Sequence, residues 1–287
     1  MEHLKIFVNL TRLNKPIGIF LLFWPCSWGL ALAYNSNKDL NIFLFYLLLF
    51  FIGSVLMRSA GCIFNDIVDR DLDKGVKRTK QRPIAAGKIS VKKSLVYVVS
   101  LCLLAFIILI QFNFLTIFLG LGSMVLAFSY PFMKKITYWP QLFLGLTFNW
   151  GIIMGWTSIT NNLTIEPVIL YLAAIFWTLG YDTIYGFQDI KDDEIIGVKS
   201  TSIKFKNNPK KILILCYTIT IISLITIGKL MNSNFIYFSL MVIPFMHLFY
   251  FQIYRLKAND PLNCLKIFKS NNSFGLIVLI IIILSKI

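Results

Sequence analysis

The sequence has 287 residues, of which 57% are hydrophobic and only 14% are charged, and its mean hydropathy is +0.73. Soluble domains are about one quarter charged, and here the hydrophobic residues come in long runs with almost no charge, so the composition excludes an ordinary soluble globule and predicts a membrane protein. The net charge of +15 would suggest nucleic acid in a soluble protein, but Lys and Arg also collect in the loops of membrane proteins.

Nine apolar runs are long enough, or nearly so, to cross a membrane core that needs about 20 helical residues. We therefore expect an all-α membrane protein, a single domain over residues 1–287 with nine transmembrane helices around a central cavity. Because only residues 111–113 separate the third and fourth runs, the turn between them must be tight. The runs cover residues 17–34, 41–64, 94–111, 113–131, 139–158, 165–186, 211–228, 234–253 and 272–286.

The basic residues lie mostly in alternate connections between these runs, which predicts one orientation in the membrane. In that orientation the N-terminus and both acidic clusters described below are cytoplasmic. The composition is rich in Lys, Ile and Asn, and no Arg- and Ser-rich transit segment precedes the first run. We therefore expect a multi-pass protein of a bacterial inner membrane.

The few acidic residues are concentrated in two short stretches, one from Asn65 to Asp73 and one from Asp182 to Glu194. Asn65, Asp69 and Asp73 are spaced four residues apart, so a continuing helix places them on one face. Asp189 and Asp193 repeat this spacing. Like charges at this spacing repel unless a cation lies between them, and paired hard oxygen ligands suit Mg²⁺ completed by substrate phosphates. The alternative is an ordinary solvated loop.

Basic side chains near the first cluster suit a phosphate group. Arg78 and Arg82 are four residues apart and could form a paired clamp on phosphate oxygens, although the charge bias of loops also explains this basic run. Tyr130 and Lys134, at the end of the fourth run, form a second donor pair. Arg58 lies inside a span, where an arginine is costly and usually functional. Its partner is either an aspartate such as Asp69 or a bound carboxylate.

The stretch from Arg58 to Gly87 resembles the first signature of the UbiA family of intramembrane prenyltransferases, NDxxDxxxD. Residues 181–193 resemble the second signature, DxxxD, with Asp182 and Thr183 in the preceding family positions. Gly186 departs from the alanine that is usual there, and we expect little consequence. Within the family, residues 12–25 and 129–141 are similar to the branch that acts on 4-hydroxybenzoate.

The resemblance implies a ring of transmembrane helices around a cavity with a polar cap over its cytoplasmic mouth. It implies transfer of a polyprenyl chain from polyprenyl diphosphate to C3 of 4-hydroxybenzoate in ubiquinone synthesis, in the lipid bilayer and without nucleic acid. The implied cofactor Mg²⁺ would bind to Asn65, Asp69, Asp73, Asp189 and Asp193. Substrate contacts would come from Arg58, Asn65, Arg78, Arg82, Tyr130 and Lys134. The implied catalytic residues are Asp69, Asp73, Asp189 and Asp193, and Asp182 is a further catalytic candidate that could take the ring proton or shield the cation.

Two other functions remain open from the sequence. One is a related prenyltransferase with another acceptor, such as a naphthoate, homogentisate, haem or chlorophyllide. The other is a cation-coupled transporter whose carboxylates bind the ion. A transporter of that kind places its ion site near the bilayer midplane, in broken helices. Here the carboxylates lie at the ends of spans, beside clustered phosphate-type donors, which favours the prenyltransferase.

Overall fold

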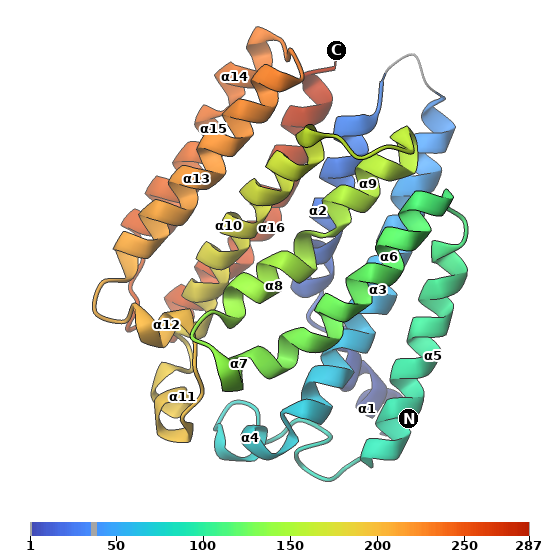
Figure 1. The fold of residues 1–287 in the computed structure, drawn as a ribbon. Helices are drawn as coiled ribbons and strands as arrows, with labels where there is room; N and C mark the ends of the chain where they lie inside the picture. Colours follow the sequence, from blue (N-terminus) through green and yellow to red (C-terminus); the bar gives the residue numbers. More distant parts are fainter. Residues whose placement is uncertain (1, 36–38, 287) are drawn as a thin grey trace.

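The computed structural model describes residues 2–35 and 39–286, and these form helices without any β-strand (Figure 1), so the all-α prediction is confirmed. The first half of the chain contains α1 (Glu2–Thr11), α2 (Ile17–Ala33), α3 (Leu40–Val68), α4 (Arg70–Gly75), α5 (Val91–Leu109), α6 (Phe114–Ser129), η1 (Tyr130–Phe132), α7 (Met133–Ile136) and α8 (Pro140–Asn149). The second half contains α9 (Gly151–Thr160), α10 (Ile165–Gly186), α11 (Ile190–Ile196), α12 (Thr201–Lys204), α13 (Pro209–Leu230), α14 (Phe235–Leu240), α15 (Val242–Met246), η2 (His247–Tyr254) and α16 (Pro261–Leu284).

Eight helical segments in the described part of the chain are long and apolar enough to cross a membrane, rather than the nine predicted. The exception is α2, which is apolar but has only 17 residues. The tight turn predicted between the third and fourth runs is confirmed, since α5 ends at Leu109 and α6 begins at Phe114. Asn113 caps α6 with its side chain, which accepts a hydrogen bond from the Thr116 backbone N–H at 3.0 Å.

Close packing between helices depends on glycine at two positions where backbones nearly touch. A Cβ atom on Gly29 of α2 would lie 2.0 Å from the carbonyl oxygen of Ile152 in α9, and one on Gly155 would lie 2.4 Å from the carbonyl oxygen of Cys26. In a membrane, where lipid is as apolar as leucine, such small residues allow the backbone approach that drives helix association. Glycine therefore fixes α2 against α9.

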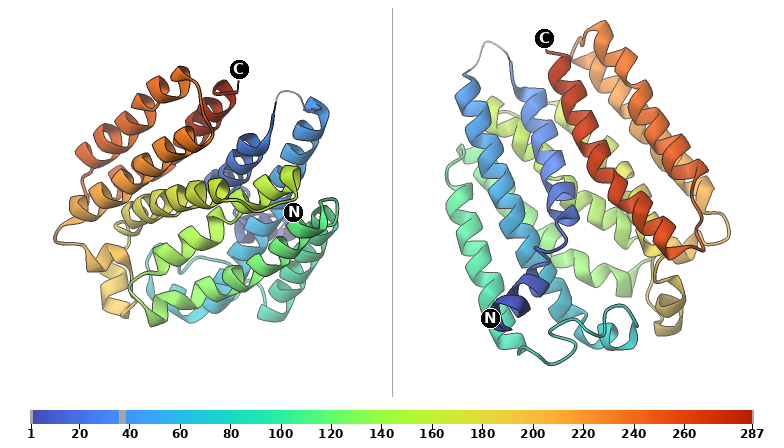
Figure 2. Two further views of the ribbon diagram at one scale, coloured as in Figure 1. Left: turned by 45° about the horizontal axis from the view of Figure 1, so that its top comes forward. Right: turned by 180° about the vertical axis from the view of Figure 1, so that it is seen from behind.

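The C-terminal helices form an outer layer on one side of the molecule. α13 packs against α10, and α16 packs against both α10 and α2, beside which it lies in Figure 2. The buried indoles of Trp28 and Trp177 tie this layer to the rest: Trp28 Nε1 donates to the Gly275 carbonyl at 2.8 Å, and Trp177 Nε1 donates to Asn271 Oδ1 at 2.7 Å. These bonds satisfy polar groups that would be costly to bury unpaired.

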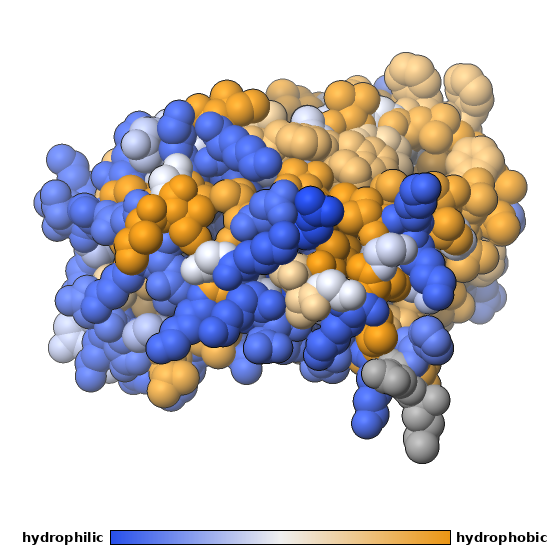
Figure 3. All heavy atoms as spheres, turned by 90° about the horizontal axis from the view of Figure 1, so that it is seen from below, coloured by the Kyte–Doolittle hydropathy of each residue, from blue (hydrophilic) through white to orange (hydrophobic). Residues whose placement is uncertain are grey.

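Short helices gather at one end of the bundle. α4 and α11 contact each other there, near α7 and α12, and hydrophilic side chains spread over this face in Figure 3. α3 carries the first acidic motif to this end because its 29 residues extend about 43 Å, more than an apolar core of about 30 Å. This end of the bundle holds the site described next.

Two predicted boundaries differ from the structure. The last span begins at Pro261, well before the predicted residue 272, because Asp260 caps the helix by accepting hydrogen bonds from the N–H groups of Leu262 and Asn263. The second span runs on to Val68, so that Asn65 and Asp66 lie inside it. Both helices extend through polar residues, which a prediction based on apolar runs does not include.

Candidate active site

A cavity of about 1600 Å³ opens among the polar residues at this end and extends between apolar helix faces. α2, α3, α5, α6, α8, α9 and α10 line it, with the edge of α16, while no residue of 201–264 does. The cavity therefore lies among the helices of the first two thirds of the chain, with one edge on α16. All eleven predicted site residues line it: Arg58, Asn65, Asp69, Asp73, Arg78, Arg82, Tyr130, Lys134, Asp182, Asp189 and Asp193.

The first acidic motif keeps helical spacing across a break in the helix. α3 ends at Val68 and α4 begins at Arg70, but the Asp69 N–H still donates to the Asn65 carbonyl at 2.9 Å and the Asp73 N–H to the Asp69 carbonyl at 2.8 Å. The Asn65 amide donates to Asp69 Oδ2 at 2.8 Å. Asp69 and Asp73 are both buried. The spacing therefore brings these three side chains together as predicted.

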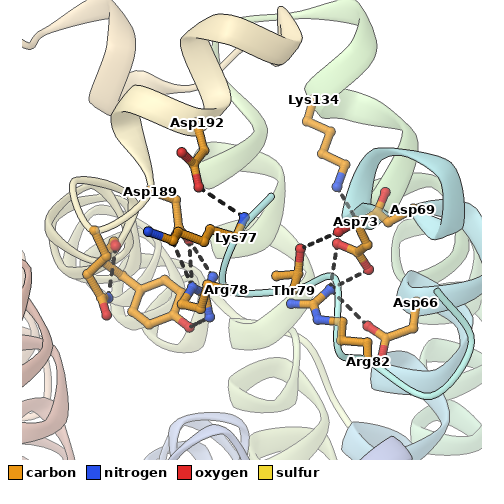
Figure 4. Close-up of polar contacts among 12 residues, drawn as sticks. Asp66, Asp69, Asp73, Lys77, Arg78, Thr79, Arg82, Lys134, Asp189 and Asp192 are labelled. Atoms are coloured by element: carbon orange, nitrogen blue, oxygen red, sulfur yellow. Dashed lines mark hydrogen bonds and ion pairs between the residues drawn. The ribbon is translucent and has the colours of Figure 1, made fainter. Parts of the chain in front are cut away.

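The second motif contacts the loop that follows the first one (Figure 4). Arg78 Nε donates to both carboxylate oxygens of Asp189, at 2.8 and 2.9 Å, and Arg78 Nη1 donates to the Tyr185 hydroxyl at 3.2 Å. The Lys77 backbone N–H donates to Asp192 Oδ2 at 3.1 Å. Two segments more than a hundred residues apart in the sequence thus meet at the mouth of the cavity.

The predicted phosphate-binding residues lie on different walls of the mouth. Lys134 in α7 forms an ion pair with Asp69, and Tyr130 lies in η1 at the start of that turn. Arg82 Nη1 donates to Asp73 at 2.8 Å, whereas Arg78 pairs with Asp189 of the other motif. Arg78 and Arg82 are therefore each held toward the cavity by a different acidic motif.

Arg58 lies deeper in the cavity and forms no ion pair with any carboxylate of residues 2–35 or 39–286. Its guanidinium stands over the Phe148 ring, 5.2 Å from the centroid, and a Cβ on Gly18 would lie 2.5 Å from its Nε. The suggested pairing with Asp69 is therefore wrong, because Asp69 is bonded to Asn65 and Lys134. An arginine held without a carboxylate beside an apolar wall suits an anionic group of a ligand.

The donor set fits a divalent cation held partly by its substrate. No group of three or more His, Cys, Asp or Glu is arranged to hold a metal within the described residues. Mg²⁺, however, needs only one or two carboxylates when phosphate oxygens and water complete its shell. Asp69 Oδ1 is buried without a hydrogen-bond partner, and burial, followed by the nearby Asp189 charge, raises the pKa of Asp193 to about 6. Both features favour a cation here.

Sequence reasoning left Asp66, Asp71 and Asp192 without a role and assigned Arg12 no place in the site. Asp66 is buried and pairs with Arg12 at 2.6 Å and Arg82 at 3.0 Å. Asp71 is exposed and pairs with its neighbours Arg70 and Lys74. The partners of Asp66 are distant in sequence, so helical spacing could not reveal them. The signal in the sequence was the signature NDxxDxxxD, in which Asp66 is the second specified position.

Gly186, the departure from the family pattern, lies where α12 packs against α10. A Cβ on this residue would lie 2.2 Å from Ser202 Oγ, which donates to the Thr183 carbonyl at 2.8 Å. An alanine would therefore require the Ser202 side chain to shift. Glycine here permits a closer contact between α10 and α12.

Known proteins match this chain in both sequence and fold. The model of the UbiA prenyltransferase family matches residues 22–276. Among solved structures, the apo structure of a UbiA homolog from Aeropyrum pernix K1 has a TM-score of 0.72 at 21% identity, covering 93% of this chain and 96% of that one. A UbiA homolog from Archaeoglobus fulgidus also has a TM-score of 0.72, at 18% identity, covering 97% and 99%.

Curated relatives cover almost the whole chain. The 4-hydroxybenzoate polyprenyltransferase, mitochondrial, of Bos taurus is 43% identical over 98% of this chain and 75% of its own length, and that of Homo sapiens is 42% identical with the same coverage. These relatives are named as mitochondrial, which makes the prediction of a bacterial inner membrane, with a cytoplasmic N-terminus and cytoplasmic acidic motifs, wrong. The sequence, the fold and the residues that line the cavity agree, and the chain belongs to the UbiA prenyltransferase family.

Proposed function

We propose that this protein transfers a polyprenyl group from a polyprenyl diphosphate to C3 of 4-hydroxybenzoate, a step of ubiquinone synthesis. One observation carries the proposal: the two acidic motifs and their basic partners meet at the mouth of one cavity whose deeper walls are largely apolar. This arrangement suits a substrate with a charged head and a long hydrocarbon tail. The choice of 4-hydroxybenzoate as the acceptor is supported by the relatives that are named as 4-hydroxybenzoate polyprenyltransferases.

The diphosphate binds at the mouth. Arg78, Arg82 and Lys134 donate charge-assisted hydrogen bonds to its oxygens, and Tyr130 adds a neutral donor. Ten Lys and Arg side chains line the cavity against six Asp, so the wall attracts an anion even with every carboxylate ionised. These donors stabilise the negative charge that grows on the leaving diphosphate.

Mg²⁺, when bound by residues of the two acidic motifs, supplies Lewis-acid stabilisation of the same charge. Asn65, Asp69 and Asp73 of the first motif and Asp189 and Asp193 of the second would hold the ion. Solved structures of the Archaeoglobus fulgidus homolog are described as bound to GPP and Mg²⁺, to DMAPP and Mg²⁺, or to Cd²⁺, which supports a divalent cation in a related fold.

The acceptor lies deeper, with its carboxylate toward Arg58 and its ring facing the allylic carbon of the donor. The carbon–oxygen bond of the donor breaks, and the ring carbon ortho to the phenol oxygen attacks the allylic carbon. The ring proton is lost to Asp182, which lines the cavity and forms no ion pair within the described residues. Apolar walls keep water away from the allylic cation. The products are the prenylated acid and diphosphate.

The test uses purified protein in detergent with ring-labelled 4-hydroxybenzoate and prenyl diphosphates of several lengths, with Mg²⁺ or with excess EDTA. Parallel reactions offer a naphthoate or homogentisate in place of the labelled acid. We expect label in an extractable lipid product only with 4-hydroxybenzoate and Mg²⁺. Prenylation of another acceptor in preference to 4-hydroxybenzoate would replace the proposed substrate.

A further inference from the structure

The buried carboxylate of Asp66 lies between two arginines that come from different parts of the chain. Its Oδ1 accepts a hydrogen bond from Arg12 Nη2 at 2.6 Å and from Arg82 Nη1 at 3.0 Å, as Figure 4 shows for Arg82. The side chain of Asp66 is 1% exposed, and its Oδ2 has no hydrogen-bond partner within the described residues. One buried carboxylate thus orders two cations at the rim of the cavity.

The two arginines are not equivalent. Arg82 is also bonded to Asp73, so two carboxylates hold it, whereas Arg12 forms an ion pair with Asp66 alone among the described residues. The Arg12 side chain is 26% exposed and lines the cavity. A guanidinium has five N–H donors, and Asp66 accepts from one nitrogen, so Arg12 has donors to offer to an anion in the cavity.

The backbone conformation of Arg12 is energetically unfavourable, so the fold must hold this residue in place. Arg12 follows the last residue of α1 and has φ = +56°, a left-handed conformation that is unfavourable for a residue with a branched or long side chain. Such a conformation persists only where the surroundings enforce it, and it is enriched at functional sites. The ion pair with Asp66 holds the Arg12 side chain at this position.

We propose that Asp66 is a positioning residue that holds Arg12 at the mouth, where Arg12 binds the terminal phosphate of the prenyl diphosphate. The inference rests on the proposed function and adds the N-terminal segment to the donor site. The terminal phosphate is the part of the donor furthest from the reacting carbon. Arg12 reaches the cavity from the segment before the first apolar helix, at the same end as Arg82, whereas Arg58 lies deeper.

The test compares Arg12→Gln and Asp66→Asn with a matched pair close by in the sequence. Arg70 and Asp71 form an exposed ion pair outside the cavity, so Arg70→Gln and Asp71→Asn remove the same charges from the neighbouring segment. For each variant we would measure KM for the prenyl diphosphate, KM for the aromatic acid, the thermal midpoint, and the affinity for inorganic diphosphate with Mg²⁺ by calorimetry.

We expect Arg12→Gln to raise KM for the prenyl diphosphate about tenfold or more and to weaken binding of inorganic diphosphate by a similar factor, because one charged hydrogen bond is lost. KM for the aromatic acid stays unchanged. Asp66→Asn has the same signature, and the double variant is no worse than the more severe single variant, because Asp66 acts through Arg12. The Arg70 and Asp71 variants behave as wild type.

Several outcomes would overturn the inference while wild-type activity leaves the proposed function intact. One is a lower thermal midpoint in Arg12→Gln with unchanged diphosphate affinity, since that pattern describes a purely structural ion pair. Another is additive loss in the double variant. If Asp66→Asn does not fold, comparison of Arg12→Lys with Arg12→Gln carries the test: equal diphosphate affinity in both and in the wild type contradicts a phosphate contact. An inactive wild type would instead contradict the proposed function.

Discussion

At the scale of single residues, most carboxylates that line the cavity have a basic partner across it. Asp69 pairs with Lys134, Asp73 with Arg82 and Asp189 with Arg78. Each ion pair holds both of its side chains in place at the cavity. The basic side chains can then bind the phosphate of a ligand, and the acidic side chains can bind the metal ion that accompanies it. Asp193 has no ion-pair partner within the described residues, and burial, followed by the Asp189 charge, raises its pKa.

A first prediction concerns the acidic motifs. Asp69→Asn and Asp193→Asn each lower turnover at least about a hundredfold, because each removes charge that balances the metal and the departing diphosphate. The protein stays folded, since asparagine keeps the size of the side chain. Steady-state rates over a range of Mg²⁺ concentrations, with Asp71→Asn as the exposed control, test this. Wild-type turnover in either purified variant would remove these residues from the metal site.

A second prediction concerns Arg58. Arg58→Ala raises KM for the aromatic acid more than KM for the prenyl diphosphate, by about one order of magnitude or more, because a carboxylate loses its charged partner. Measuring both constants on one preparation separates the two substrates. An analogue of the aromatic acid that lacks the carboxylate serves as control, since its KM should not change in Arg58→Ala. A rise confined to the diphosphate would place Arg58 at the wrong substrate.

The sequence was informative about residues that act through regular spacing and silent about those that act through distant contacts. Asn65, Asp69 and Asp73 come together because the i to i−4 hydrogen bonds continue past the end of α3. Asp66 occupies a position next to Asn65, yet its partner Arg12 is 54 residues away, and only the fold brings them together. Arg58 was correctly singled out as unusual, whereas the suggested aspartate partner was wrong.

At the scale of elements, α3 organises the cavity. Gly53, Met57, Gly61 and Asn65 are four residues apart along it and all line the cavity. A Cβ on Gly53 or Gly61 would meet no atom within 4 Å. The two glycines thus leave space beside the helix, about 18 Å and about 6 Å from Asn65 along its axis. This space suits the hydrocarbon tail of the donor.

A third prediction follows from these distances. Gly61→Leu fills the cavity near the diphosphate and impairs transfer of every prenyl group, whereas Gly53→Leu fills it further along and impairs only long donors, which raises the ratio of short-chain to long-chain turnover several-fold. Competition between short and long prenyl diphosphates, with products resolved by mass, measures the ratio. Gly122→Leu is the control, because Gly122 has the same free space but lies outside the cavity wall. Equal length profiles in the wild type and in Gly53→Leu would show that the tail lies elsewhere.

Helix α3 also shows what a prediction from apolar runs misses. The span that becomes α3 was expected to end at residue 64, but the helix continues to Val68 because backbone hydrogen bonds do not depend on side-chain polarity. α16 likewise begins with polar residues behind the cap of Asp260. Hydropathy located the apolar core of each span and missed its polar extension, and the polar extension of α3 bears the first acidic motif.

At the scale of the whole molecule, the helices do not contribute equally to the cavity. α13 and the segment Phe235–Tyr254 pack outside it, and α16 supplies one edge. The sequence predicted helices around a cavity but not this asymmetry, because apolar runs do not show which face meets lipid and which meets another helix. The prediction of the membrane compartment was wrong because it depended on charge bias and composition. Both properties are compatible with more than one kind of membrane.

The central claim is that both acidic motifs serve one transfer reaction at one cavity. The most direct test measures diphosphate release and ring-prenylated product together, in one reaction of purified protein with prenyl diphosphate, 4-hydroxybenzoate and Mg²⁺. The account predicts one diphosphate for each prenylated acid, and loss of both products when either Asp69 or Asp189 is changed to Asn or when EDTA removes the metal. Diphosphate release that does not require the aromatic acid, or transfer that survives loss of one motif, would contradict it.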